Sequence, residues 1–346
     1  AFMASAWGYV NKKPGVMIAA SGPGMTNTVT SLHVATESAM PLVVLGGSTA
    51  GPTRGLGGFQ EADQVAFAKP GCKWTAQVDS TERIPEFVHL ALGKSVSGRP
   101  GAVYVDFPGH LVGRKVDEEK VRFRKGVAMQ TVPHPDPAGI EAIATMLCEA
   151  QRPLILVGKG AAWADASAPL TQLVNRGIPF VGSPMGRGTI PDDNPMCVNA
   201  ARSAALAGAD MILMAGGRFN WIFQFGRPPR YADGVRLAQI DIMAEEFHSA
   251  ANIEAGVVAD CAVALEQLNQ AMDGRALRTS AGGWYDSLRE AATKNEAAIA
   301  EQMDSDSQPI NHYRLLRDVR DAVTRDTAIS VDGEMTMGVA RAVMPC

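Results

Sequence analysis

Short, nearly continuous apolar runs recur along the chain and predict buried β-strands. They cover residues 15–20, 41–47, 101–108, 154–157, 178–182, 211–215, 237–242 and 255–259. Patterns compatible with helices lie between them, as at 28–38 and 83–94. Strands that are apolar on both faces and alternate with helices are typical of parallel sheets covered by helices on both sides. The sequence therefore predicts an α/β fold.

The order of these elements divides the chain into successive parts. The expected parts are a first domain (1–112), a proline-punctuated linker (113–137), a central domain (138–272), a polar connection without strands (273–309) and the start of a third domain (310–346). The last part should hold a helix at 310–324 and a strand at 327–332. The chain begins without Met inside a helical pattern and ends soon after this strand, so we expect a fragment of a longer protein.

Four charged residues of the central domain follow strand ends. They are Lys159, Arg218, Asp241 and Asp260. Ligands of open α/β sheets bind beyond the carboxyl ends of the strands, where Lys and Arg suit a phosphate and Asp suits a ribose hydroxyl. The pattern is consistent with a nucleotide site. However, no complete G-x-G-x-x-G is present, and glycine turns with solvated charges explain the spacing equally well.

Two loops of the first domain also carry candidate chemistry. Residues 21–27 join the first strand to a helix, whose amino end offers unpaired N–H groups. Their Ser-Gly-Pro-Gly sequence followed by Asn favours a ligand-facing loop over a plain connection. The glycine-rich loop 51–58 leads into Phe59, Gln60 and Glu61 beyond the second strand. These side chains can form the edge of an active site or be solvated loop residues.

Composition narrows the class of protein. A net charge of −4 gives no reason to expect a nucleic-acid partner or an anionic membrane surface. The five cysteines are scattered without a C-x-x-C pair, which indicates a reducing compartment, and we expect the cytoplasm. The six histidines lack metal-ligand spacing, so no metal-binding residue is predicted. We find no signal peptide and no apolar run long enough to cross a bilayer.

Several segments together resemble the thiamine-diphosphate-dependent enzymes. The segments are 21–27, 59–61 and 97–101 for the first domain, 184–188 and 191–192 for the central domain, and 332–341 for the opening of the last domain. Residues 217–222, 225–226 and 228–231 are closely similar to 2-hydroxyacyl-CoA lyases, and the related oxalyl-CoA decarboxylases share much of this. Residues 332–335 differ from the commoner Glu-Gly-Ala-Asn.

The resemblance implies a fold and an activity. The fold would be a multi-domain thiamine-diphosphate enzyme with a pyrimidine-binding domain, a central ADP- or FAD-type domain and a diphosphate-binding domain, assembled as a homo-oligomer. The activity would be cleavage of a 2-hydroxyacyl-CoA into formyl-CoA and an aldehyde or ketone, with thiamine diphosphate, Mg²⁺ and ADP as cofactors. Oxalyl-CoA decarboxylase, an acetolactate-synthase-like enzyme and a non-catalytic nucleotide-binding fragment are the alternatives.

The resemblance also assigns residues to roles. The catalytic loop would contain Phe59 and Gln60; thiamine diphosphate would meet Gly22, Pro23 and Asn27; ADP would meet Arg99, Lys159, Arg218, Asp241 and Asp260; CoA phosphates would meet Arg202 and Arg341. Exposed surface arginines are the alternative for the last two. The family's activating Glu would precede Ala1, and its Gly-Asp-Gly metal segment does not occur, so we expect this chain alone to be inactive.

Overall fold

The computed structural model describes residues 1–121, 123–124, 126, 131–281, 283–324 and 326–344. It divides into two compact units, Ala1–Thr131 and Val132–Cys346. Part of the expected linker at 113–137 and the last cysteine, Cys346, lie outside the described residues. The expected division into three domains and two linkers remains a prediction.

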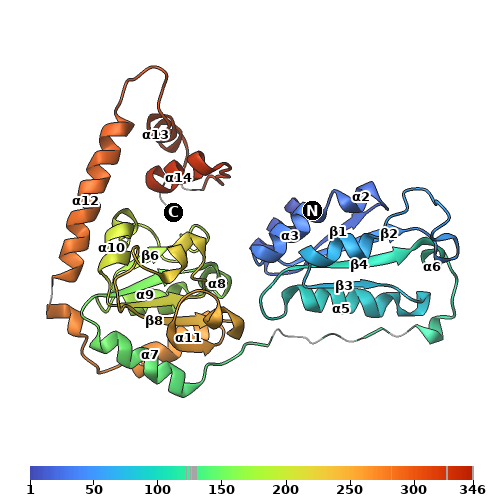
Figure 1. Cartoon of the computed structure of the whole chain (residues 1–346), viewed down its shortest axis with the longest axis horizontal. Helices are drawn as coiled ribbons and strands as arrows, with labels where there is room; N and C mark the ends of the chain where they lie inside the picture. The colour runs from blue at the N-terminus through green and yellow to red at the C-terminus, as the bar shows by residue number, and fades with distance from the viewer. Residues whose placement is uncertain (122, 125, 127–130, 282, 325, 345–346) are drawn as a thin grey trace. The chain divides into compact units, whose positions relative to one another are not determined.

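The first unit is built on a parallel four-stranded sheet (Figure 1). In spatial order its strands are β1 (Gly15–Ala19), β2 (Leu42–Ser48), β4 (Ala102–Pro108) and β3 (Trp74–Gln77). The helices are α1 (Phe2–Asn11), α2 (Pro23–Thr26), α3 (Val29–Glu37), α4 (Gln64–Ala68), α5 (Ile84–Val96) and α6 (Gly109–Val112). Leu32 of α3 packs in the core on one face of the sheet and Phe87 of α5 in the core on the other.

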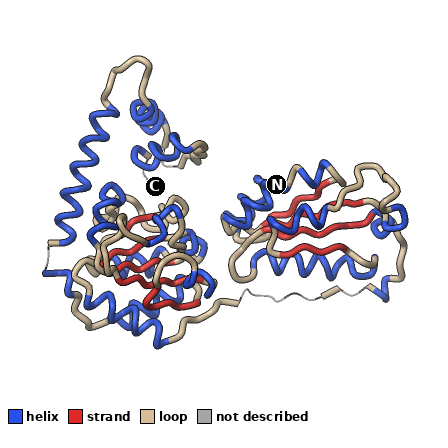
Figure 2. Tube along the Cα trace, viewed as in Figure 1, coloured by secondary structure: helices blue, strands red, loops and turns tan. Residues whose placement is uncertain are grey.

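The second unit is built on a parallel five-stranded sheet (Figure 2). In spatial order its strands are β6 (Phe180–Gly182), β5 (Pro153–Val157), β7 (Met211–Ala215), β8 (Arg236–Asp241) and β9 (Ile253–Val258). The helices are α7 (Pro137–Glu149), α8 (Lys159–Trp163), α9 (Ser167–Val174), α10 (Arg202–Gly208), α11 (Cys261–Ala271), α12 (Trp284–Met303), α13 (His312–Ala322) and α14 (Glu334–Val343).

The two faces of this second sheet have separate cores. Helices α7, α9 and α11 cover one face, where Leu147, Leu170 and Leu265 are buried. Helices α10 and α12 cover the other, where Leu206 and Trp284 are buried. Each unit thus has helices on both faces of a parallel sheet, which confirms the α/β fold predicted from the apolar runs.

The predicted strand at 327–332 is wrong. The chain there is neither helix nor strand, although the helix predicted before it is present as α13. A strand needs a neighbour to complete its hydrogen bonds, and the pairings within the described residues include none for this segment. The β propensity of Ile329 and Val331 is therefore not sufficient to form a strand.

Candidate functional site

The two candidate loops of the first unit meet at the carboxyl edge of its sheet. Gly22 has a φ of 54°, and a β-carbon built on it would lie 2.6 Å from the backbone oxygen of Gln60. The Ser21 hydroxyl donates a long hydrogen bond of 3.4 Å to Gln60 Oε1. Only glycine permits both this backbone conformation and this approach. The structure therefore brings together two residues that the sequence assigned to one site.

The other residues assigned to this site lie at its surface. Phe59 is 87% exposed, and Pro23 and Asn27 are exposed at the two ends of the four-residue α2. Gln60 has a left-handed φ of 53°, which is uncommon for a residue with a side chain. Such backbone strain persists only where the surrounding contacts hold it, and it is often found at functional sites.

Glu61 holds the glycine-rich loop closed. Its carboxylate accepts hydrogen bonds from the backbone N–H groups of Gly55 and Gly58. The bond from Gly55, followed by that from Gly58, lowers the pKa of the Glu61 carboxyl below 4.5. Glu61 thus shapes the loop that precedes Gln60.

A buried glutamine that the sequence analysis did not select lies beneath both loops. Gln64 is 2% exposed, and its Oε1 accepts a 2.6 Å hydrogen bond from the Gly22 N–H. Its Nε2 donates to the Gly47 carbonyl at 2.9 Å, to the Tyr104 hydroxyl at 2.7 Å and to Asp106 Oδ1 at 2.8 Å. One side chain therefore connects the turn after β1 with β2 and β4.

The carboxylate of Asp106, which is 1% exposed, extends this network to β3. Its Oδ1 also accepts from the Tyr104 hydroxyl at 2.8 Å, and its Oδ2 accepts from Ser48 Oγ and Gln77 Nε2, both at 2.6 Å. Burial, and then the neighbouring carboxylate, raise the pKa of Tyr104 far above its ordinary value, so this hydroxyl stays a donor. The signal in the sequence was an Asp inside an apolar run, which a buried strand tolerates only with hydrogen-bond partners.

In the second unit, the glycines after β5 and β7 pack against one another. A β-carbon on Gly158 would lie 2.2 Å from the oxygen of Gly216, and one on Gly160 would lie 2.8 Å from the same atom. Gly160 N–H donates to this oxygen at 2.7 Å. Strands β6 and β7 lie on opposite sides of β5, so the strand order reverses at this contact. Ligands of open α/β sheets bind at such a reversal of strand order.

Three of the residues assigned to ADP lie at this edge. Lys159 begins α8 directly after Gly158, and Arg218 follows the glycines of β7. Asp241, 9% exposed, ends β8, and its Oδ1 accepts from Met243 N–H at 3.0 Å. Arg218 lies 3.9 Å from a Glu246 carboxylate oxygen. Because β5, β7 and β8 are parallel neighbours, the structure brings these strand ends together.

The other two residues assigned to ADP have structural contacts. Asp260 is the N-cap of α11, where its Oδ1 accepts from Ala262 N–H at 3.0 Å and Val263 N–H at 3.3 Å. Arg99 belongs to the first unit and donates to the Glu37 carbonyl at 2.7 Å.

The two arginines assigned to CoA both belong to the second unit. Arg202 donates to the Ile222 carbonyl, and its guanidinium lies 4.7 Å from the centre of the Phe223 ring. Burial, with a contribution from Arg341, lowers the pKa of Arg202. Arg341, on α14, donates to the Met337 carbonyl at 3.2 Å.

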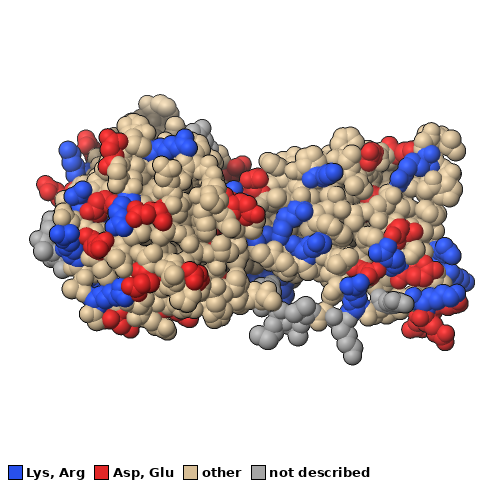
Figure 3. All heavy atoms as spheres, turned by 60° about the horizontal axis from the view of Figure 1, so that its bottom comes forward, with Lys and Arg blue, Asp and Glu red and all other residues tan. Residues whose placement is uncertain are grey.

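Charges elsewhere on the surface are interspersed. On the face shown in Figure 3, both acidic and basic side chains are present over each unit. In the second unit, for example, Arg236 pairs with Glu254 at 2.7 Å, and Arg275 pairs with Glu141 at 2.7 Å.

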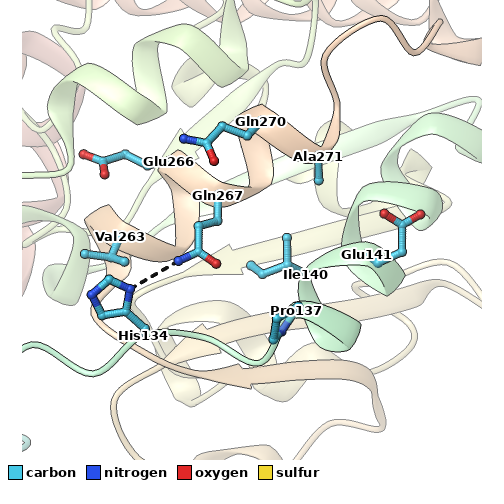
Figure 4. Close-up of a pocket in the computed structure, with 9 residues that line it drawn as sticks. All are labelled: His134, Pro137, Ile140, Glu141, Val263, Glu266, Gln267, Gln270 and Ala271. Carbon is cyan, nitrogen blue, oxygen red and sulfur yellow. Dashed lines mark hydrogen bonds between the residues drawn. The ribbon is translucent and has the colours of Figure 1, made fainter.

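A groove of about 650 Å³ lies between α7 and α11 (Figure 4). Its lining residues are His134, Pro137, Ile140, Glu141, Val263, Glu266, Gln267, Gln270 and Ala271. A 3.3 Å hydrogen bond joins the side chains of His134 and Gln267. None of the residues selected from the sequence lines this groove.

The described part of the chain has neither a cluster of metal-binding side chains nor a membrane-spanning helix. Among those residues, no group of three or more His, Cys, Asp and Glu side chains could hold a metal ion. No helix among them is both long and apolar enough to span a membrane.

Comparison with known proteins identifies the family. Residues 1–67 match the N-terminal TPP binding domain of thiamine pyrophosphate enzymes, and residues 140–268 match their central domain. The chain is 34% identical over 345 residues to human 2-hydroxyacyl-CoA lyase 1, and 33% identical over 358 residues to 2-hydroxyacyl-CoA lyase of rice. It is 30% identical over 354 residues to oxalyl-CoA decarboxylase of Escherichia coli.

These alignments cover 99% of this chain but only 60% of the human protein and 62% of each of the other two. The chain therefore spans about three fifths of the length of these relatives. The two matched domains agree with the two parallel sheets. The chain belongs to the thiamine pyrophosphate enzymes, of which it carries the N-terminal and central domains.

Proposed function

We propose that the complete protein is a thiamine-diphosphate-dependent lyase that cleaves a 2-hydroxyacyl-CoA into formyl-CoA and an aldehyde or ketone. The observation that carries this proposal is the 34% identity to a 2-hydroxyacyl-CoA lyase along 99% of the chain. The bound cofactor supplies the electron sink for breaking the carbon–carbon bond.

Residues of the first unit fit a neutral, partly apolar ligand. The turn at Gly22 abuts the backbone of Gln60, while the neighbouring Phe59 and Pro23 are exposed. The Ser21 hydroxyl donates to Gln60 Oε1, so the carboxamide can present its N–H groups to a substrate oxygen. We propose that Gln60 stabilises negative charge on the reacting acyl group without adding a buried charge.

The test of this role is Gln60→Ala in the complete enzyme. Removing one donor to a developing oxyanion lowers kcat by about 100- to 1,000-fold, and we expect a much smaller effect on KM. Gln151→Ala, at an exposed glutamine of the second unit, is the matched control. An unchanged kcat in Gln60→Ala would show that Gln60 does not act in the active site.

Oxalyl-CoA decarboxylase is the second candidate, because a decarboxylase is 30% identical to the chain over 354 residues. Incubation of the complete protein with each acyl-CoA separates the two activities. Release of formyl-CoA with an aldehyde or ketone from a 2-hydroxyacyl-CoA supports the lyase. Release of carbon dioxide from oxalyl-CoA with no cleavage of the hydroxyacyl substrate supports the decarboxylase.

We also propose that the second unit binds ADP at the carboxyl ends of β5, β7 and β8. Lys159 and Arg218 would bind its phosphates and Asp241 its ribose hydroxyls, with Asp260 as a further contact. Bound ADP stabilises the folded state, so the Tm should rise with nucleotide concentration. Asp241→Ala should remove most of that rise. No shift at millimolar ADP, or bound flavin in the purified protein, would contradict this assignment.

The remaining parts of the proposal concern the complete protein. We propose that Arg202 and Arg341, both of the second unit, bind CoA phosphates, since a guanidinium group suits a phosphate. We propose Mg²⁺ as the metal cofactor that accompanies thiamine diphosphate. We further propose a homo-oligomer acting in the cytoplasm, and the three-domain division given above.

A further inference from the structure

The carboxamide of Gln64 has one allowed orientation. The Gly22 N–H can only donate and the Gly47 carbonyl can only accept, and both lie within 2.9 Å of the Gln64 side chain. Turning the amide over would place oxygen against oxygen and nitrogen against nitrogen. The hydrogen-bonding needs of the backbone therefore fix the direction of this side chain.

The acceptors around Gln64 Nε2 hold it in that direction. Three oxygens, those of Gly47, Tyr104 and Asp106, share its two hydrogens. The Tyr104 hydroxyl can accept from Gln64 because its own hydrogen goes to Asp106. A β-carbon on Gly46 would lie 2.2 Å from the Tyr104 oxygen, so glycine at this position gives the hydroxyl its space.

The network ends at the two loops of the proposed active site. Gln64 fixes the N–H of Gly22, and Gly22 in turn lies against the backbone of Gln60. The polar groups involved are buried, so the contact is shielded from competing water. Gln60 is four residues before Gln64 in the chain, yet its connection to the network runs through the turn after β1.

We propose that Gln64 is a positioning residue that sets the Gly22 turn, and through it Gln60, at the carboxyl edge of the first sheet. Asp106 supports it by orienting the Gln64 amide. Neither side chain contacts substrate in this scheme. The structural connection stands on the contacts alone, whereas its effect on catalysis rests on the proposed function.

The direct test is hydrogen–deuterium exchange of the Gly22 amide in this chain. Gln64→Met has a similar length and removes both the acceptor and the donors. Loss of a buried hydrogen-bond partner predicts exchange of the Gly22 amide on the order of 10- to 100-fold faster. Ser48→Ala removes one donor to Asp106 but leaves the acceptor of Gly22, so Gly22 should stay protected in this control.

Gln64→Glu separates positioning from general stability. It keeps an acceptor for Gly22, and a proton shared with Asp106 can keep the contact between the two side chains. Gly22 should therefore stay protected in this variant. Unchanged Gly22 exchange in Gln64→Met, or equal acceleration in Gln64→Met and Ser48→Ala, would overturn the proposal. If Gln64→Met does not fold, loss of Gly22 protection in a folded Gln64→Glu variant would overturn it.

In the complete enzyme, Gln64→Met should lower kcat on the order of 10-fold or more and leave KM for the acyl-CoA within about threefold. The reason is that the variant changes the position of Gln60 relative to the reacting acyl group, while the contacts that bind CoA stay the same. Gln64→Glu should recover part of kcat. An unchanged kcat in Gln64→Met would refute the catalytic part. If the wild-type enzyme cleaves no acyl-CoA, the proposed function fails, while the exchange result still decides whether Gln64 positions the turn.

Discussion

Replacing Gly158 by alanine tests whether backbone packing, and not the turn itself, requires glycine after β5. Gly158 has a φ of −97° and a ψ of 176°, a conformation that alanine adopts readily. The new β-carbon, however, would lie 2.2 Å from Gly216 O and 2.4 Å from Gly217 Cα, at least 1 Å short of the 3.4 Å at which ordinary contact begins. Both neighbours are backbone atoms, so rotating a side chain cannot relieve the clash.

The expected cost is at the upper end of that for overpacking, about 3 kcal/mol. For a domain of this size each 1 kcal/mol shifts Tm by about 2–4 °C, so the second unit should unfold about 6–12 °C lower. Differential scanning calorimetry of the chain measures this shift. Gly338→Ala is the control, because Gly338 is an exposed residue of α14 with nothing within 4 Å, and alanine there should be neutral or stabilising. An unchanged Tm in Gly158→Ala would refute the steric reasoning.

Two further predictions concern the titration of Glu61 and the binding of thiamine diphosphate. Because the pKa of Glu61 is lowered, its carboxylate should stabilise the 51–58 loop fully above pH 4.5, and this stabilisation should be lost as pH falls through the lower pKa of the folded state. Carbon-13 NMR titration of the Glu61 carboxyl should give a midpoint below 4.5. A midpoint at or above 4.5 would contradict the loop contacts. This chain alone should not bind thiamine diphosphate with Mg²⁺ tightly, because the Gly-Asp-Gly segment that the family resemblance assigns to the metal and the diphosphate does not occur in its sequence. A micromolar Kd by calorimetry would refute this.

Sequence patterns predicted elements that are long or buried on both faces. Leu154, Ile155, Leu156 and Val157 are all 0–1% exposed in β5, as their continuous apolar run predicted. Strand β3, Trp74–Gln77, was missed because it is short, lies at an edge and is only half-buried. Its pairing with β4 depends on tertiary structure, which local composition does not encode.

The burial of polar residues also depends on tertiary contacts that local sequence does not encode. The sequence selected the loop at 59–61 as a candidate site, but a glutamine three residues later resembled any solvated loop residue. Gln64 is buried because Gly22, Gly47 and Asp106 converge on it from three other segments. Its hydrogen bonds reach partners 17 to 42 residues away in the chain, and no local pattern predicts that convergence.

Gly22 and Gly158 each lie in a turn that follows a strand, and both have the same structural explanation. In the sequence, the glycines at 22 and 158 lie in turns that follow strands, and both turns were considered as parts of ligand sites. In the structure each is required by a close approach of the protein's own backbone, at Gln60 in one unit and at Gly216 in the other. Glycine in these turns is therefore explained by packing that brings two loops together at a sheet edge. The case for a ligand depends on the polar side chains presented there, and substitutions at Gln60 and Asp241 test ligand binding more directly than substitutions of the glycines.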